Sequence, residues 1–105
     1  MKKITYNKLV RDLIPEIIEK DGKKAIFKKL HVSEITTALV EKLSEEGQEF
    51  LEAVNLEELA DILEIVYALI EHNDFKLEDV EKIRKLKQEQ RGSFSEGIFL
   101  EYVLN

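Results

Sequence analysis

Four carboxylates near the middle of the chain are spaced in two pairs that could bind a metal ion. Glu46 and Glu49 are three residues apart in one predicted helix, and Glu58 and Asp61 are three residues apart in the next. Residues at this spacing share a helical face, so each pair directs its oxygens to one side. Carboxylates held together repel, and burying them unpaired is costly. A divalent cation relieves the repulsion, and all-oxygen ligation favours Mg²⁺ or Mn²⁺, with coordination positions left for water and substrate phosphates.

The apolar periodicity of the first of these helices places Glu46 on its buried face. Apolar residues recur at spacings of four, four, seven and four, at Ile35, Leu39, Leu43, Phe50 and Val54. Glu46 fills the gap of seven, three residues after one apolar position and four before the next. Glu49 borders the same face, whereas Glu45 and Glu52 are expected further round, toward solvent. The alternative is that these carboxylates are ordinary helix-surface groups and that Glu58 only caps its own helix. Of the four carboxylates, the inward Glu46 is the one that this alternative explains least well.

The second of these helices is apolar nearly all round. Ten of the twelve residues in 59–70 are apolar or aromatic, and the exceptions are Asp61 and Glu64. Such a helix must be covered on several sides, and a short chain has few other helices to cover it. A second copy of the chain, in a homodimer or homotetramer, is the simplest source of the missing surface. Glu58 and Asp61 share a face with Ile65 and are expected to point toward other protein.

The remaining signals predict an all-α fold, a four-helix bundle. A first helix over 13–20 follows Asp12 as its N-cap, with Pro15 in the first turn and Gly22 as the left-handed residue after its end. Ser33 is predicted to cap the second helix, which carries Glu46.

The third and fourth helices have equally clear ends. Asn55 is predicted to cap the third helix, with Glu58 at its third position, and this helix is expected to end near Glu71. The fourth covers 77–91 and ends at Gly92. Its inward residues are expected to be Val80, Ile83 and Leu86.

Two short segments, near 24–30 and 97–103, combine β-forming and polar residues and could pair as a small two-stranded sheet. With 105 residues the chain fits one domain, 1–105, with a single modest core.

Composition excludes several classes of function. The chain has no cysteine, which excludes disulfides, thiolate metal sites and cysteine nucleophiles. Neither His31 nor His72 forms an E-x-x-H motif with an upstream glutamate, so a di-iron carboxylate site is not expected. The net charge of −6 argues against a duplex nucleic acid partner. No apolar run is long enough to cross a membrane and the N-terminus lacks a secretory signal, which predicts a cytoplasmic protein.

Motifs in order along the chain carry a resemblance to a known family. They are "YNKLVRDLIPEII" at 6–18, "EEGQE" at 45–49, "ELAD" at 58–61 and "RGSFSEGIFLEYV" at 91–103. In these motifs, and over nearly its full length, the chain resembles the MazG-like all-α nucleoside triphosphate pyrophosphohydrolases, which are related to phosphoribosyl-ATP pyrophosphohydrolase. The first and last motifs are similar to those of one subgroup. The chain departs from the usual pattern in the eight-residue spacer 50–57, which is short, and in Ser93, which replaces a second glycine.

The resemblance implies Mg²⁺ ligands at the four carboxylates selected above, Glu46, Glu49, Glu58 and Asp61, with Glu45 behind them. It also implies hydrolysis between the α and β phosphates of a nucleoside triphosphate, giving a monophosphate and pyrophosphate, in nucleotide-pool housecleaning. Attack by water on phosphorus needs a group that takes the water's proton, and Glu49 and Glu46 are the candidate catalytic residues.

A triphosphate also needs cations from the protein. Lys8 and Arg11 lie three residues apart in the first motif and Arg91 begins the last, so all three are predicted to bind substrate phosphates. The alternative is that they are surface charges or salt-bridge partners in an acidic protein. Two other functions stay open: phosphoribosyl-ATP hydrolysis in histidine synthesis, and a non-catalytic helical dimerisation module that keeps the fold.

Overall fold

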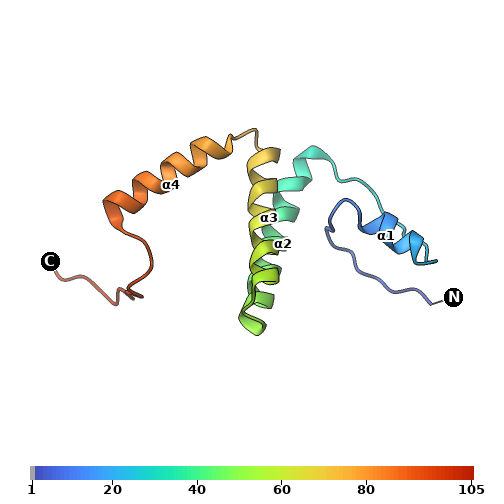
Figure 1. Cartoon of the computed structure of the whole chain (residues 1–105), viewed down its shortest axis with the longest axis horizontal. Coiled ribbons are helices and arrows are strands. Elements are labelled where there is room, and N and C mark those ends of the chain that lie inside the picture. Colours follow the sequence, from blue (N-terminus) through green and yellow to red (C-terminus); the bar gives the residue numbers. More distant parts are fainter. Residues whose placement is uncertain (1) are drawn as a thin grey trace. The chain divides into compact units, whose positions relative to one another are not determined.

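Four α-helices form the regular structure of the chain in this computed structural model, which describes residues 2–105 (Figure 1). The helices are α1 (Ile14–Lys20), α2 (Val32–Glu52), α3 (Leu56–His72) and α4 (Leu77–Arg91). The described residues contain no strand, so the predicted all-α class with four helices is confirmed. The chain divides into two compact units, Met1–Asp74 with the first three helices and Phe75–Asn105 with α4.

The small sheet predicted from 24–30 and 97–103 is wrong. Neither segment forms a strand, and Ile26, Phe27 and Ile98 within them are exposed. Apolar side chains favour a strand only where a neighbour supplies hydrogen bonds and a surface to pack on, and an isolated two-stranded ribbon is marginal in water.

The helix α1 begins one residue later than predicted and has a different N-cap. Leu13 occupies the cap position and no side chain accepts a hydrogen bond there, so Asp12 does not cap the helix. Pro15 lies in the first turn, where its missing N–H leaves no helical bond unmade. Gly22 follows the helix with φ of +81°, and its N–H donates to the carbonyl of Glu19 at 3.0 Å. Glycine takes this left-handed conformation without the strain that a side chain would add.

The N-cap of α2 is His31 and not Ser33. Its ring Nδ1 accepts a hydrogen bond from the backbone N–H of Ser33 at 3.2 Å, and Glu34 accepts one from the backbone N–H of His31 at 3.1 Å. This reciprocal arrangement is a capping box. Sequence rules favour serine at the cap because its oxygen accepts a hydrogen bond, but an unprotonated imidazole nitrogen offers an equivalent lone pair two residues earlier.

The helices α2 and α3 pack side by side as a helical hairpin (Figure 1). Only residues 53–55 connect them, and Asn55 caps α3 as predicted by accepting a hydrogen bond from the N–H of Glu58 at 2.9 Å. At the other end of the hairpin, the amide of Asn73 donates to the hydroxyl of Thr36 at 3.2 Å. The two helices are therefore antiparallel, and the C-terminal half of α2 lies beside the start of α3.

The core of the hairpin is small. Leu39 and Ile65 are the buried hydrophobic residues of the described chain, with 6% and 7% of their surface exposed. Burying one such side chain contributes about 1.5–3 kcal/mol, which is small against the conformational entropy lost on folding. Glu46 is buried to the same degree, 7% exposed, so a carboxylate occupies part of the limited interior.

The outer face of α3 carries a row of exposed apolar side chains. Leu56, Leu59, Leu63 and Tyr67 form this outer stripe, and between 45% and 84% of each residue's surface is exposed. Their spacing of three, four and four residues places them on one side of the helix. Because α3 is apolar nearly all round, one of its apolar faces remains exposed in its own unit.

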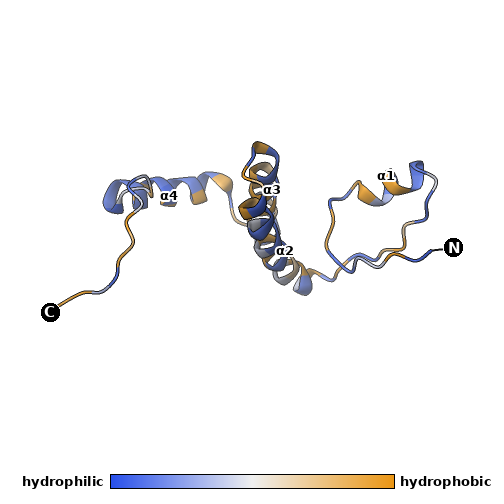
Figure 2. Cartoon of the chain, turned by 90° about the horizontal axis from the view of Figure 1, so that it is seen from below, coloured by the Kyte–Doolittle hydropathy of each residue, from blue (hydrophilic) through white to orange (hydrophobic). Residues whose placement is uncertain are grey.

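The C-terminal unit contains α4, a largely hydrophilic helix (Figure 2), and the tail that follows. Gly92 ends the helix as predicted, with φ of +84°. Ile83 and Leu86 were expected to face inward, but both are exposed and only Val80 is partly buried, because this unit offers α4 no second helix to pack against. Across residues 2–105, no helix combines the length and apolar character that crossing a membrane requires.

Candidate metal centre

The antiparallel hairpin brings the predicted carboxylates together. Glu46 and Glu49 come from the C-terminal half of α2, and Glu58 and Asp61 come from the first turns of α3. Ligand oxygens of Glu46, Glu58 and Asp61 all lie within 4.8 Å of one another, and the same limit holds for Glu45, Glu46 and Glu49. Glu46 belongs to both groups, so it is the centre of the site. These five residues are called the carboxylate cluster below.

Glu45 lies nearer the other carboxylates than its position on the helix predicted. Its side chain is 39% exposed, and one oxygen also lies 3.5 Å from the ammonium of Lys8. Glu45 and Glu49 are four residues apart, so their side chains are neighbours on the helix surface although Glu45 lies outside the apolar stripe. Glu52, one helical turn after Glu49 on α2, is exposed as expected.

Two buried oxygens of the cluster have no hydrogen-bond partner. They are the Oε2 atoms of Glu46 and Glu58. A buried acceptor left unsatisfied costs about 1–3 kcal/mol, and more when it carries charge. Folded proteins contain few buried polar atoms without a hydrogen-bond partner, and a bound ion is one explanation for those that occur. The unpartnered oxygen on the central, nine-tenths-buried Glu46 is the observation that separates this cluster from an ordinary acidic surface.

The electrostatics of the site oppose the ionisation of Glu46. Burial is the largest cause that raises the pKa of its carboxyl, and the neighbouring carboxyl of Glu49 raises it further through a hydrogen bond and through charge. The charge of Asp61 acts in the same direction, whereas the ammonium of Lys42 lowers the pKa and offsets part of the rise. A cation placed among these oxygens would reverse the balance by favouring the charged form.

Lys42 is a residue of the site that the sequence reasoning missed. Its Nζ lies 3.5 Å from Oε1 of Glu46 and 4.0 Å from Oε1 of Glu45, and its side chain is only 18% exposed. A lysine and a glutamate four residues apart on a helix are within reach of each other, so the pairing was visible as the i, i+4 spacing of Lys42 and Glu46. The pair belongs to the site because Glu46 is the residue that both groups of carboxylates share.

Two of the three predicted phosphate-binding residues lie at the cluster. The guanidinium of Arg11 donates to Oδ1 of Asp61 at 2.7 Å, and Lys8 pairs with Glu45 at 3.5 Å. Both come from the irregular segment before α1, so the first sequence motif and the acidic motifs form one site within the N-terminal unit. Arg91 is the exposed last residue of α4 and belongs to the C-terminal unit.

The donor set of the cluster suits a hard cation. All of its candidate ligand atoms are carboxylate oxygens, with no imidazole or thiolate among them. Oxygen-only sites favour Mg²⁺, Mn²⁺ or Ca²⁺ over softer metals. The cluster could therefore bind a metal ion, and its unpartnered oxygens fit that role.

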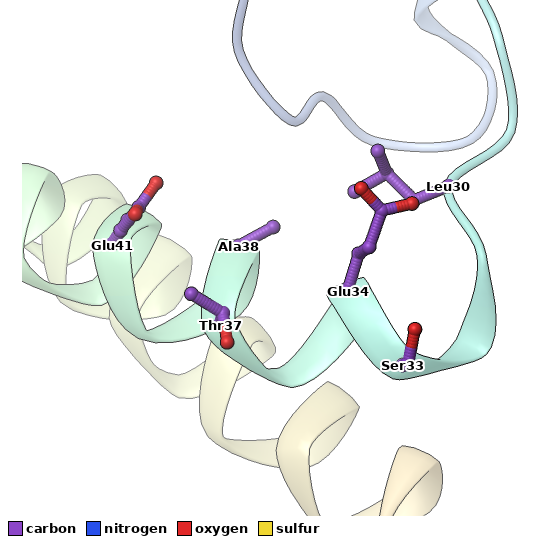
Figure 3. Close-up of a pocket in the computed structure, with 6 residues that line it drawn as sticks. All are labelled: Leu30, Ser33, Glu34, Thr37, Ala38 and Glu41. Carbon is purple, nitrogen blue, oxygen red and sulfur yellow. The ribbon is translucent and has the colours of Figure 1, made fainter.

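A separate shallow hollow lies beside the start of α2, on the face drawn in Figure 3. It is lined by Leu30, Ser33, Glu34, Thr37, Ala38 and Glu41. None of these residues belongs to the carboxylate cluster, and no lysine or arginine lines the hollow. It does not have the charges that a phosphate-binding site needs.

Comparison of the chain with protein-family models, with curated proteins and with solved structures found no match.

Proposed function

We propose that this chain is a Mg²⁺-dependent nucleoside triphosphate pyrophosphohydrolase that cleaves between the α and β phosphates and acts in cytoplasmic nucleotide-pool housecleaning. The observation that carries the proposal is the buried Glu46, with an unpartnered oxygen, at the centre of a cluster of five carboxylates. This agrees with the spacing of the acidic motifs, and with the resemblance of the four sequence motifs to those of MazG-like enzymes. Lys8 and Arg11 at the edge of the cluster add the positive charge that a triphosphate needs.

In this proposal Glu46, Glu49, Glu58 and Asp61 hold the metal ion, and Glu45 supports these ligands without binding the metal itself. When bound, Mg²⁺ supplies charge neutralisation of the phosphate oxygens and a lower pKa for a coordinated water.

The reaction forms one bond and breaks one. A water oxygen attacks the α phosphorus, the bond from this phosphorus to the bridging oxygen breaks, and pyrophosphate leaves with the bonding electrons. The proton lost by the water passes to a carboxylate, and Glu49 or Glu46 is the proposed acceptor. Lys8 and Arg11 are proposed to contact the phosphates and offset their charge, whereas the phosphate-binding role of Arg91 stays a prediction from the sequence.

The proposed enzyme is a homodimer or homotetramer. The outer stripe of α3 supports this proposal, because its side chains are apolar and exposed along several turns. Apolar faces of this kind on a helix are usually covered by another helix. A second copy of the chain is proposed as the cover.

The test is pyrophosphate release from a panel of standard and damaged ribo- and deoxyribonucleoside triphosphates, with phosphoribosyl-ATP beside them, in Mg²⁺ and in chelator. We expect chelator-sensitive release with the monophosphate as co-product. Glu49→Gln is expected to stay folded and to lose this activity, whereas Glu52→Gln removes the same charge from an exposed position on α2 and is expected to keep it.

Three outcomes distinguish the alternatives. Hydrolysis of phosphoribosyl-ATP alone would assign the chain to histidine synthesis. Near-normal turnover by Glu49→Gln would refute the ligand assignment. A folded protein that neither binds Mg²⁺ nor turns over any substrate would be a non-catalytic module.

A further inference from the structure

The charges of the N-terminal unit are divided between two parts of the chain. Residues 1–31 hold nine lysines and arginines against four acidic residues, whereas residues 32–74 hold twelve acidic residues against one lysine. The hairpin is thus strongly negative and the segment before it is positive. The positive net charge of the N-terminal segment and the negative net charge of the hairpin attract each other. This attraction favours a position of the segment on the hairpin.

Only a few contacts fix this segment to the cluster. The arm, defined here as residues 2–12, forms no helix or strand, and nearly all of its side chains are exposed. Its ion pairs are those of Lys8 with Glu45 at 3.5 Å and of Arg11 with Asp61 at 2.7 Å. Both partners of the arm are therefore members of the carboxylate cluster.

We infer that the arm is a latch on the metal site: Arg11 and a divalent cation compete for Asp61, so metal binding releases the arm and frees its two cations for the substrate. This inference rests on the proposed metal site and adds a regulation to it.

The competition follows from the geometry at Asp61. Arg11 already occupies Oδ1 of this carboxylate, and Asp61 is also one of the three residues whose oxygens converge within 4.8 Å around Glu46. A cation bound by these oxygens would lie close to the guanidinium, and two positive charges at that separation repel. Lys8, 3.5 Å from Glu45, is repelled in the same way, because Glu45 lies within 4.8 Å of Glu46 and Glu49.

The coupling acts in both directions. If the metal weakens the contacts of the arm, the arm must weaken the binding of the metal by the same factor, because linkage is reciprocal. The Arg11 and Asp61 side chains are about half exposed, at 56% and 41%, so the effect is moderate. Removing Arg11 should tighten metal binding by up to about fivefold, the upper range for a partly exposed pair.

The experiment measures Mg²⁺ binding by calorimetry and the mobility of the arm by backbone ¹⁵N relaxation, on the full chain without nucleotide. The test variant is Arg11→Gln. Its matched control is Arg84→Gln, which makes the same change at an arginine paired with Glu81 in the other compact unit.

In the wild type, saturating Mg²⁺ should lower the order parameters of the arm amides toward those of a flexible segment. Arg11→Gln should bind Mg²⁺ more tightly and have an arm that is already mobile, with no further change on adding metal. Arg84→Gln should match the wild type in both measurements.

The failures are distinguishable. Equal Mg²⁺ affinity in wild type and Arg11→Gln, with an arm unaffected by metal, overturns the latch and leaves the metal site standing. Weaker binding by Arg11→Gln also overturns it, since Arg11 would then support the site. Absence of Mg²⁺ binding in wild type and in Arg11→Gln overturns both the latch and the proposed function.

Discussion

Replacing Glu46 with glutamine should stabilise the metal-free protein while removing its response to metal. Ionised Glu46 is buried, has an unpartnered oxygen and lies beside Glu49 and Asp61, so its charge opposes folding. Glutamine keeps the shape and removes the charge. It also loses the ion pair with Lys42 at 3.5 Å, which offsets part of the gain.

The expected magnitude is modest. A buried unsatisfied acceptor costs about 1–3 kcal/mol and more when it is charged; glutamine keeps polar atoms at this position, so the gain is only the part of the cost that comes from the charge. Lys42 keeps Glu45 as a partner at 4.0 Å, so the loss of its pair with Glu46 offsets about 1 kcal/mol. The net gain for Glu46→Gln is therefore about 1 kcal/mol, which raises the Tm of a domain of this size by about 4 °C.

The gain should depend on pH with a definite sign. The pKa of Glu46 is raised in the folded state, so the folded form prefers the protonated carboxyl. Below the ordinary value of 4.5 the group is protonated in both states, and wild type and Glu46→Gln should have similar stability. As the pH rises through the raised pKa, the wild type loses stability relative to the variant, so the difference in Tm grows toward neutral pH.

Magnesium should reverse the order of the two proteins. A ligand at about 100 times its Kd stabilises the protein that binds it by about 2.7 kcal/mol. The wild type should gain this stabilisation and Glu46→Gln should not. Thermal unfolding at fixed protein concentration, between acid and neutral pH, with Mg²⁺ and with chelator, measures both effects, and Glu52→Gln controls for the loss of one negative charge. A variant less stable than wild type in chelator at neutral pH would refute this account of Glu46.

Three further changes test other parts of the structure. Ile65→Asp puts a charge at one of the few buried apolar positions and should unfold the hairpin or dissociate the proposed oligomer, so a folded variant of unchanged mass in light scattering would contradict the packing described for α3. Leu63→Glu, at an exposed position of the outer stripe, should leave the helical circular dichroism intact and lower the mass in solution; an unchanged mass would rule out this face as the interface. Asn55→Ala removes the hydrogen bond to the N–H of Glu58 and should cost about 1 kcal/mol in chemical unfolding, whereas an effect near zero would mean that water satisfies this group equally well.

The sequence predicted the parts of the site that depend on one helix at a time. The inward position of Glu46 followed from the spacing of apolar residues around it, and the start of α3 followed from Asn55. The short connection between α2 and α3 then leaves few ways to arrange the two acidic pairs other than beside each other.

Other features depend on contacts between distant segments or on a choice between similar groups. The pairing of Arg11 with Asp61 joins an irregular segment to a helix, and no periodicity indicates which carboxylate an arginine will reach. At the start of α2, His31 and Ser33 both offer an acceptor, and local backbone geometry decides between them. The segments near 24–30 and 97–103 contain strand-forming residues, but a strand also needs a partner, which residue patterns alone do not guarantee.

The three-residue connection between α2 and α3 also bears on how the site forms during folding. Glu46 and Asp61, at the two ends of the proposed ligand set, are separated by only fourteen residues along the chain. Closing so short a loop costs little entropy, and contacts close in sequence form early in folding. The ligands should therefore meet while the rest of the chain is still unfolded, so that a divalent cation present at that stage could speed the formation of the hairpin as well as stabilise the finished protein.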